Sequence, residues 1–233
     1  MDLEFNSIVT EQFSFVKALS EKNGKRIIVV RHNRTDEKYI RIDTSHDTEI
    51  YDALKKLKCN NLPRVYGVFP GPDGSSVIEE YIDGLTVAQV MSEGLYGESA
   101  VREVVKGVCN ALYALHSRGI IHRDIKPENI IIDKNGNAVL IDFDAARVYK
   151  SYKTQDTSFV GTSGFAAPEQ YGITQTDERT DIFSVGVLMN VMLTGEHPSR
   201  KMYGGRLSKI IEKCINVDPE KRYSSVAELY NKL

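Results

Sequence analysis

The chain has 233 residues, of which 41% are hydrophobic and 27% are charged, a composition typical of an ordinary globular protein. Its 30 basic and 32 acidic residues leave a formal charge of −2, so no net electrostatic field favours nucleic acid or a membrane surface as a partner. The length is sufficient for one large domain or for two small lobes that share a core.

The first residues and the cysteines predict a cytoplasmic location. Asp2 and Glu4 stand close to the initial methionine, and no long apolar run follows them, which argues against a signal peptide or a membrane span. The three cysteines are far apart in sequence and form no C-x-x-C pair, so they are expected to be buried free thiols in a reducing compartment; they are Cys59, Cys109 and Cys214.

The first third of the chain predicts short strands and one helix. Runs of β-branched and aromatic residues mark strands near 13–15, 27–30 and 39–42, with turns at Asn23-Gly24 and at 33–37. Apolar residues then recur at helical spacing over 48–58. A Pro- and Gly-rich turn at 70–74 leads into a further strand at 77–82. We expect Asp83-Gly84 to separate an N-terminal lobe, 1–82, from a C-terminal lobe, 83–233.

The rest of the chain is predicted to be mainly helical. A helix over 99–119 has Ser99 as its N-cap and a continuous apolar stripe. Strands at 129–133 and 139–143 flank Asn135-Gly136, a hairpin signal. Residues 182–193 are apolar nearly all round, which predicts a buried helix, and Ser225-x-x-Glu228 resembles a capping box. The predicted fold class is therefore α+β, with two lobes.

Two nearby segments carry the residues that suggest chemistry. His-Arg-Asp-Ile-Lys-Pro-Glu-Asn occupies 122–129, and Ile-Asp-Phe-Asp occupies 141–144. Phosphoryl transfer needs a base beside the attacking hydroxyl, divalent ions on the phosphates, and cations that neutralise the transferred group. Asp124, Lys126, Asn129 and Asp142 supply such groups in that order, and the oxygen ligands of Asn129 and Asp142 suit Mg²⁺.

These segments resemble the catalytic loop and D-F-G motif of eukaryotic-type protein kinases. The resemblance implies a bilobal fold, with a small antiparallel β-sheet and one helix in the N-lobe and a mainly helical C-lobe. It also implies ATP and Mg²⁺ as cofactors, Asp124 as the catalytic base, Lys126 on the transferred phosphate, and Asn129 and Asp142 on the metal. Ile131 is expected to contact the nucleotide.

Further residues resemble the activation segment of the same family. Gly161-Thr162 and Ala167-Pro168-Glu169 are similar to its end, and Arg222 resembles the buried partner of Glu169. Lys126 together with Thr162 resembles the serine/threonine branch, so protein hydroxyls are the expected acceptors. His122 is expected to be a packing residue under the catalytic loop and not an acid or base.

The N-terminal lobe departs from the family pattern at the phosphate-binding elements. Residues 19–26 contain one glycine where the family has a glycine-rich loop, so Lys22 or Lys25 either contacts phosphate or is part of a solvated hairpin tip. Arg41 stands where the strand lysine is expected, and we predict that it pairs with Glu49 of the following helix. The alternative is that Glu49 is an ordinary surface residue.

The strand at 77–82 resembles the hinge that holds adenine in this family. Glu79 would be the gatekeeper, and the backbone of Glu80 and Ile82 would bond the base. Asp144 replaces the glycine of D-F-G.

Three functions remain open from the sequence. An active serine/threonine kinase explains the complete catalytic loop, whereas a pseudokinase that binds nucleotide or acts as a scaffold explains the missing glycines and strand lysine. A small-molecule kinase is the third, although the peptide-docking segment that ends at Glu169 argues against it. A protein substrate is expected, with no nucleic acid and no membrane as partner. In the family the arginine before the base can also grip a phosphorylated activation segment, which makes Arg123 a candidate partner for Thr154, Thr157 or Ser158.

Overall fold

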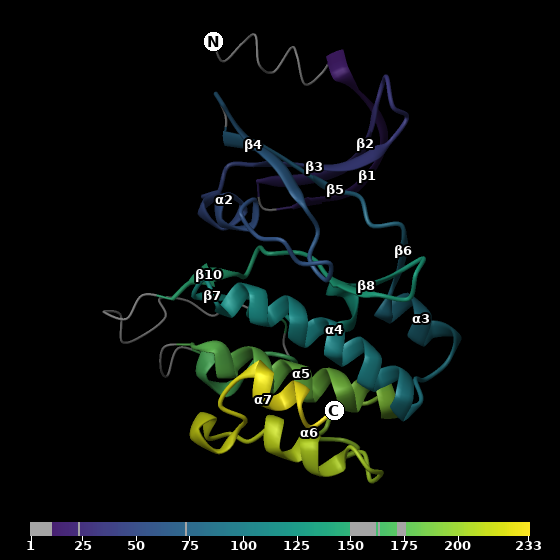
Figure 1. Cartoon of the computed structure of the whole chain (residues 1–233), viewed down its shortest axis with the longest axis vertical. Coiled ribbons are helices and arrows are strands. Elements are labelled where there is room, and N and C mark those ends of the chain that lie inside the picture. Colours follow the sequence, from purple (N-terminus) through teal and green to yellow (C-terminus); the bar gives the residue numbers. More distant parts are fainter. Residues whose placement is uncertain (1–10, 23, 73, 150–161, 163, 172–175) are drawn as a thin grey trace. The chain divides into compact units, whose positions relative to one another are not determined.

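The structure is a computed structural model of the chain, and it describes residues 11–22, 24–72, 74–149, 162, 164–171 and 176–233. The chain divides into two compact units (Figure 1). Unit 1 consists of residues 1–58 and 63–82, and unit 2 consists of residues 59–62 and 83–233. Asn23, Gly161 and the three hydroxyl residues considered for phosphorylation, Thr154, Thr157 and Ser158, lie outside the described residues.

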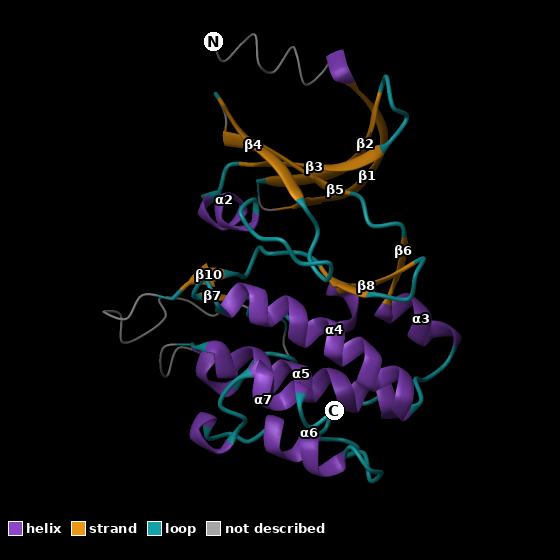
Figure 2. Ribbon diagram, viewed as in Figure 1, coloured by secondary structure: helices purple, strands orange, loops and turns teal. Residues whose placement is uncertain are grey.

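Unit 1 is built on a five-stranded antiparallel sheet with the order β1-β2-β3-β5-β4. Its strands are β1 (Phe13–Lys22), β2 (Lys25–His32), β3 (Lys38–Thr44), β4 (Val65–Gly71) and β5 (Gly74–Glu80). The β-branched runs that predicted strands all lie in this sheet. Helix α2 (Glu49–Leu54) covers one of its faces (Figure 2).

The register of the sheet decides which side chains face α2. Ile27 pairs with Ile42, and Ile42 pairs with Val77, so these three side chains lie on one face. Ile42 is 4% exposed and Val77 is fully buried. Lys25, two residues before Ile27 and therefore on the same face, donates a hydrogen bond of 3.4 Å to Tyr51 Oη of α2. We call this face, which α2 contacts, the inner face of the sheet. Its apolar rows form part of the core of unit 1, and Ile28 and Ile78 on the other face are also buried.

Helix α2 is shorter than the predicted helix over 48–58. After Leu54 the amides of Lys56 and Leu57 bond three residues back, to the carbonyls of Ala53 and Leu54. Such bonds tighten the chain into a turn in place of a further α-helical turn. The apolar spacing that continued to Leu57 therefore extends past the end of the regular helix.

The single glycine of residues 19–26 closes the hairpin between β1 and β2. Gly24 has a φ of +73°, and its carbonyl accepts a hydrogen bond of 3.2 Å from the amide of Ser45. A Cβ at this position would lie 2.7 Å from Ser45 Oγ. Glycine is thus required here for the turn and for its close approach to the end of β3.

Unit 2 is mainly helical, with two small sheets of order β6-β8-β9 and β10-β7 (Figure 2). Its α-helices are α3 (Val87–Glu93), α4 (Glu98–His116), α5 (Glu178–Thr194), α6 (Ser208–Cys214) and α7 (Val226–Tyr230). Its strands are β6 (Gly84–Thr86), β7 (Ile120–Ile121), β8 (Ile130–Asp133), β9 (Ala138–Leu140) and β10 (Arg147–Val148). Short 3₁₀ turns are η1 (Pro127–Asn129), η2 (Pro168–Tyr171) and η3 (Pro219–Lys221).

Helices α4 and α5 lie side by side at the centre of unit 2 (Figure 1). The apolar stripe predicted for α4 is confirmed, since all six of its members are buried: Val101, Val104, Val105, Val108, Leu112 and Leu115. Helix α5 is buried nearly all round, as its composition predicted. The N-cap of α4 is Gly97 and not Ser99, so the expected start of that helix was wrong by two residues.

The last helix, α7, has half of the predicted capping box. Ser225 Oγ accepts a hydrogen bond of 3.2 Å from the amide of Glu228. The Glu228 carboxylate bonds to the amide and hydroxyl of Ser224, one residue before the cap. The serine cap is therefore confirmed, and the reciprocal bond goes to the neighbouring residue.

The cysteines of the chain are free thiols. Cys109 and Cys214 are buried, as expected, whereas Cys59 is half-buried, so the expectation that all three are buried was wrong for Cys59. Among the described residues, no helix is long and apolar enough to cross a membrane.

Candidate active site

The centre of the candidate site is a triangle of polar groups around Asp124. Lys126 Nζ lies 2.6 Å from Asp124 Oδ2, and Thr162 Oγ1 lies 2.7 Å from Asp124 Oδ1. The third side is a hydrogen bond of 2.7 Å between Lys126 Nζ and Thr162 Oγ1. The structure thus brings the end of the activation segment to the catalytic loop, 38 residues earlier in the chain.

Asn129 is a further side chain that holds the Asp124 carboxylate in place. Its Nδ2 donates hydrogen bonds of 2.9 Å to both the backbone carbonyl and Oδ2 of Asp124. Because the amide nitrogen is engaged with Asp124, the amide oxygen is the atom that Asn129 can offer to a metal ion.

These contacts keep Asp124 ionised. Burial alone would raise the pKa of its carboxyl, but hydrogen bonds from Lys126, Thr162 and Asn129 hold the pKa below its ordinary value. A carboxylate that is ionised and fixed by three donors can accept a proton from a hydroxyl placed beside it.

The β8–β9 hairpin brings the second carboxylate to the same place. The amide of Ile141 donates a hydrogen bond of 2.9 Å to the carbonyl of Asn129, so the backbones that carry Asn129 and Asp142 meet. Strand β9 ends at Leu140, earlier than predicted, because Asp142 has a φ of +65° and leaves the extended conformation. The residues present fit a Mg²⁺ site that takes its other ligands from phosphate and water.

Asp181 stabilises the catalytic loop in a backbone conformation that residues other than glycine rarely adopt. Arg123 has a φ of +66°. Its amide donates to Asp181 Oδ1 at 2.7 Å, and the amide of His122 donates to Asp181 Oδ2 at 3.0 Å. Gln170 Nε2 adds a bond of 2.9 Å to the Arg123 carbonyl. Strain in the loop is thus balanced by hydrogen bonds to a buried carboxylate.

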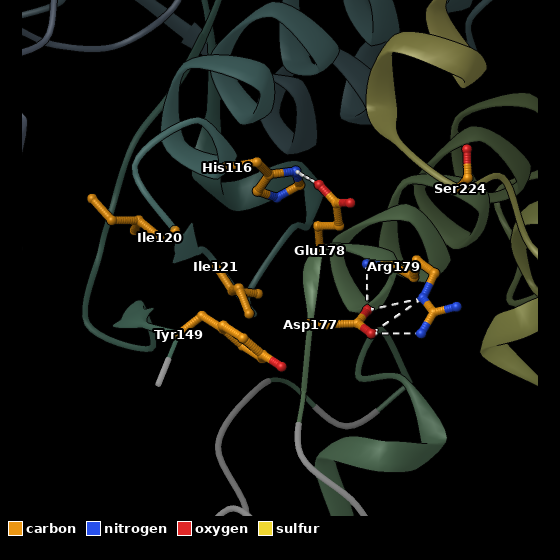
Figure 3. Close-up of a pocket in the computed structure, with 9 residues that line it drawn as sticks. His116, Ile120, Ile121, Tyr149, Asp177, Glu178, Arg179 and Ser224 are labelled. Atoms are coloured by element: carbon orange, nitrogen blue, oxygen red, sulfur yellow. Dashed lines mark hydrogen bonds and ion pairs between the residues drawn. The ribbon is translucent and has the colours of Figure 1, made fainter. Parts of the chain in front are cut away.

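His116 supports Asp181 from helix α4. Its Nε2 lies 2.8 Å from Asp181 Oδ2. Its Nδ1 lies 3.7 Å from the carboxylate of Glu178, a contact drawn in Figure 3. Burial would raise the pKa of Asp181, but its contacts with His116 and the loop amides keep the pKa below its ordinary value. His116 also lines a pocket of about 410 Å³ behind the loop, together with Ile120 and Ile121. We assign this cluster a positioning role, because it orders the backbone that carries the base.

His122 is a packing residue, as predicted. It is fully buried, and its ring stacks edge-on against Phe143 at 5.4 Å between centroids. Burial lowers its pKa despite the nearby carboxylates, so the ring is neutral near pH 7.

The side chain of Arg123 contacts the segment that follows Asp142. Its Nε donates a hydrogen bond of 2.7 Å to the carbonyl of Ala145. Arg123 is 9% exposed, and its role toward a phosphorylated activation segment stays a prediction because the candidate hydroxyls lie outside the described residues.

Glu169 and Arg222 form the predicted buried ion pair. Arg222 Nη1 and Nη2 lie 2.7 and 2.9 Å from the two oxygens of Glu169, a bidentate geometry. Thr180 Oγ1 donates a third bond of 2.9 Å to Glu169. The pair connects η2 to the segment before α7 and holds the end of the activation segment on unit 2.

We expect Arg222→Ala to destabilise the protein by about 3–5 kcal/mol, because it leaves the Glu169 carboxylate buried without its cation. Chemical denaturation followed by circular dichroism measures the effect. The matched control is Arg200→Ala, which removes an exposed arginine and should change the stability by less than about 0.5 kcal/mol. Equal losses for the two variants would contradict a structural role for the pair.

The predicted pairing of Arg41 with Glu49 was wrong. Arg41 Nε lies 2.8 Å from Asp43 Oδ1, and its Nη2 lies 3.3 Å from Ser76 Oγ. Because side chains alternate along a strand, Arg41 projects from the face opposite Ile42, away from α2. Glu49 is exposed at the start of α2, which favours the alternative that it is a surface residue.

The expected nucleotide contacts at the hinge lie at the end of β5. Glu79 pairs with Ile40 of β3 and is 6% exposed. The amide of Glu80 donates to the carbonyl of Arg64 at 2.8 Å, so a contact between Glu80 and adenine would use its carbonyl. Ile82 follows in the connection to unit 2. Ile131 lies in β8, half-buried, between Thr86 and Val139.

Two supporting residues received no site role from the sequence. Asp181 stands just before the buried helix predicted over 182–193, and Gln170 directly follows Ala167-Pro168-Glu169. Both bind backbone groups of the catalytic loop, a function for which the sequence around them carries no separate signal.

Comparisons with known proteins agree with this geometry. The sequence model described as "Protein kinase domain" matches residues 10–232. The chain belongs to the protein kinase domain family. It is 27% identical to serine/threonine-protein kinase PknB of Mycolicibacterium smegmatis and 28% identical to PknB of Mycobacterium tuberculosis, in each case over 85% of this chain. It is 32% identical to serine/threonine-protein kinase D of Synechocystis over 75% of this chain. The aligned part is 38% of the length of each of these relatives.

Proposed function

We propose that the chain transfers the terminal phosphoryl group of ATP to serine or threonine hydroxyls of proteins. The observation that carries this proposal is the triangle of Asp124, Lys126 and Thr162. Asn129 of the same loop is joined by a backbone hydrogen bond to Ile141, the residue before Asp142. The names of the relatives support the same acceptor class.

Each group of the site has a defined task. Asp124 accepts the proton of the acceptor hydroxyl, and Lys126 neutralises charge on the group in transfer. Thr162 fixes the relative position of these two side chains. Asn129 and Asp142 would hold Mg²⁺, which neutralises phosphate charge when it is bound.

A pseudokinase would not need this arrangement. Asp124 is held in one position by Lys126, Thr162 and Asn129, and its lowered pKa keeps it ionised, so the carboxylate is able to accept a proton. A small-molecule kinase is also disfavoured, because the segment up to Glu169 is anchored by Arg222, as expected for a ledge that receives a peptide. We further propose a cytoplasmic location, in agreement with the free cysteines.

The acceptor class is tested by incubating the purified chain with labelled ATP, Mg²⁺ and a generic basic protein. Acid hydrolysis of the labelled protein should yield phosphoserine and phosphothreonine, with the label absent in an Asp142→Asn control. Label only on tyrosine, or only on added sugars or lipids, would contradict the proposed acceptor. Nucleotide binding without any transfer would favour the pseudokinase.

We expect Thr162→Val to lower kcat on the order of 10-fold or more, because it removes the hydroxyl that joins Asp124 to Lys126. Thr162→Ser keeps the hydroxyl and should retain most of the activity. Steady-state kinetics with the basic protein measure both variants. A loss in the serine variant equal to that in the valine variant would show that keeping the hydroxyl does not preserve activity, which would contradict the role given to the hydroxyl.

A further inference from the structure

None of the unit 1 residues described so far in the candidate site supplies a cation for the phosphates of the nucleotide. A protein kinase needs a positive group that reaches both the phosphates and the helix beside the sheet. Arg41 does not qualify, since it projects from the face opposite α2 and pairs with Asp43. On the inner face, the β3 side chains are Lys38, Ile40, Ile42 and Thr44. Lys38 is the charged one among them, but it is exposed, stands at the end of β3 remote from the β1–β2 turn, and has its ammonium 5.4 Å from the centroid of the Tyr81 ring.

We propose that Lys25, at the start of β2, is the phosphate-binding cation of this kinase. This inference rests on the proposed function, because it assigns a residue to the nucleotide site of the same reaction. The residue directly follows the turn of the β1–β2 hairpin, which stands where the family has a glycine-rich loop.

The register places Lys25 on the inner face. It pairs with Thr44 of β3, two residues along the strands from the pair of Ile27 and Ile42, and so lies on the same face as that pair. Its ammonium donates a hydrogen bond of 3.4 Å to Tyr51 Oη on α2. Lys25 therefore makes the contact with the helix that was expected of Arg41, and it makes it with a tyrosine in place of a glutamate.

Burial distinguishes Lys25 from the other lysine of the hairpin. Lys25 is 9% exposed and is the one buried lysine among the residues that the structure describes. Lys22 lies opposite it in the hairpin but is exposed. A partly desolvated ammonium interacts more strongly with an anion than an exposed one does, because less water screens the charge.

A ligand can approach the hairpin from solvent. A recess of about 410 Å³ is lined by Lys25, by Gly24, by Thr44 at the end of β3 and by Ser45, which follows it. Gly24 places no side chain there, and its φ of +73° directs the chain into β2. The recess is also lined by Lys22 and Arg26, which are exposed, and by the carboxylates of Glu21 and Asp43. Lys25 is the buried cation among these residues.

Labelling of the wild-type chain tests this assignment without any mutation. An acyl phosphate of ATP delivers its acyl group to a lysine near the phosphates: the amine attacks the acyl carbon, the bond to the phosphate oxygen breaks, ATP leaves and an amide forms. Mass spectrometry should find the acyl group on Lys25, and excess ATP should suppress it. Label on Lys22 with Lys25 unmodified, or label on Lys25 that ATP does not suppress, would overturn the proposal.

Substitutions provide the second test. Lys25→Met should lower kcat/KM on the order of 100-fold, because it removes a charge that stabilises the transferred group. Lys17→Met, in exposed β1, is the matched control and should stay within about twofold of the wild type. Thermal denaturation shows whether each variant is folded. If Lys25→Met does not fold, the labelling experiment alone decides.

A wrong assignment of Lys25 and an absence of kinase activity would give different results. If Lys25→Met is folded and as active as the control, the assignment of Lys25 is wrong while the kinase activity stands. If the wild type shows no transfer but ATP still protects Lys25 from the acyl probe, the assignment to the nucleotide site stands and the proposed activity is wrong.

Discussion

Asp124→Asn is expected to reduce phosphoryl transfer by at least about 100-fold while leaving the fold intact. The asparagine keeps the size of the side chain but cannot accept the proton of the acceptor hydroxyl. Binding of ATP and Mg²⁺ should change little, because the base acts on the acceptor and not on the nucleotide. Rates of label transfer and nucleotide titrations by calorimetry measure the two effects.

The matched control is Asp52→Asn, an equivalent change at an exposed position of α2. It should leave transfer and binding unchanged. Wild-type turnover in Asp124→Asn would remove the base from the mechanism. The low pKa of Asp124 also predicts that its ionisation does not limit activity at any pH above the ordinary range of aspartate.

Asp142→Asn is expected to abolish transfer as well, but through nucleotide binding. Asp142 follows Ile141, whose amide bonds to the carbonyl of Asn129 at the end of the β8–β9 hairpin. The substitution removes the one formal negative charge of the two expected metal ligands, Asn129 and Asp142. We expect the affinity for ATP to lose its dependence on Mg²⁺, because a neutral ligand holds a divalent cation less well.

Titration of ATP with and without Mg²⁺ separates this variant from Asp124→Asn. The Mg²⁺-dependent part of the binding should vanish in Asp142→Asn and persist in Asp124→Asn. If Mg²⁺ strengthens ATP binding equally in both variants, Asp142 is not a metal ligand.

The catalytic half of the site could be predicted because its residues stand close together in sequence. Asp124, Lys126 and Asn129 occupy one loop, and a short hairpin brings Asp142 to Asn129. The apolar stripe of α4 was predictable for a similar reason, because apolar residues spaced three or four apart lie on one side of a helix. The Glu169–Arg222 pair spans a long separation, and only the resemblance to a known family predicted it.

The phosphate-binding half of the site could not be predicted, because the face on which a strand side chain lies depends on the exact register of strand pairing. A shift of one position turns a side chain to the other face of a sheet. Arg41 was assigned by its charge and its place near the end of a run, but the register puts the neighbouring Ile42 on the inner face. Lys25 was one of two lysines in a hairpin, and only burial and the contact with Tyr51 distinguish it from Lys22.

The positioning residues were also beyond sequence reasoning. Asp181 accepts hydrogen bonds from two backbone amides of the catalytic loop. It stands 58 residues after Arg123 in the sequence, so no local pattern connects the two. Backbone strain at Arg123 and Asp142 likewise follows from tertiary contacts that no local pattern records.

The central claim is that this chain is an active kinase, and a turnover measurement tests it most directly. Labelled ATP, Mg²⁺ and excess basic protein are incubated with a trace of wild-type chain, and phosphate transferred per chain is counted over time. The account predicts many phosphates per chain for the wild type and none above background for Asp124→Asn. A wild-type chain that is folded and binds ATP with Mg²⁺ but never transfers a phosphate would contradict it.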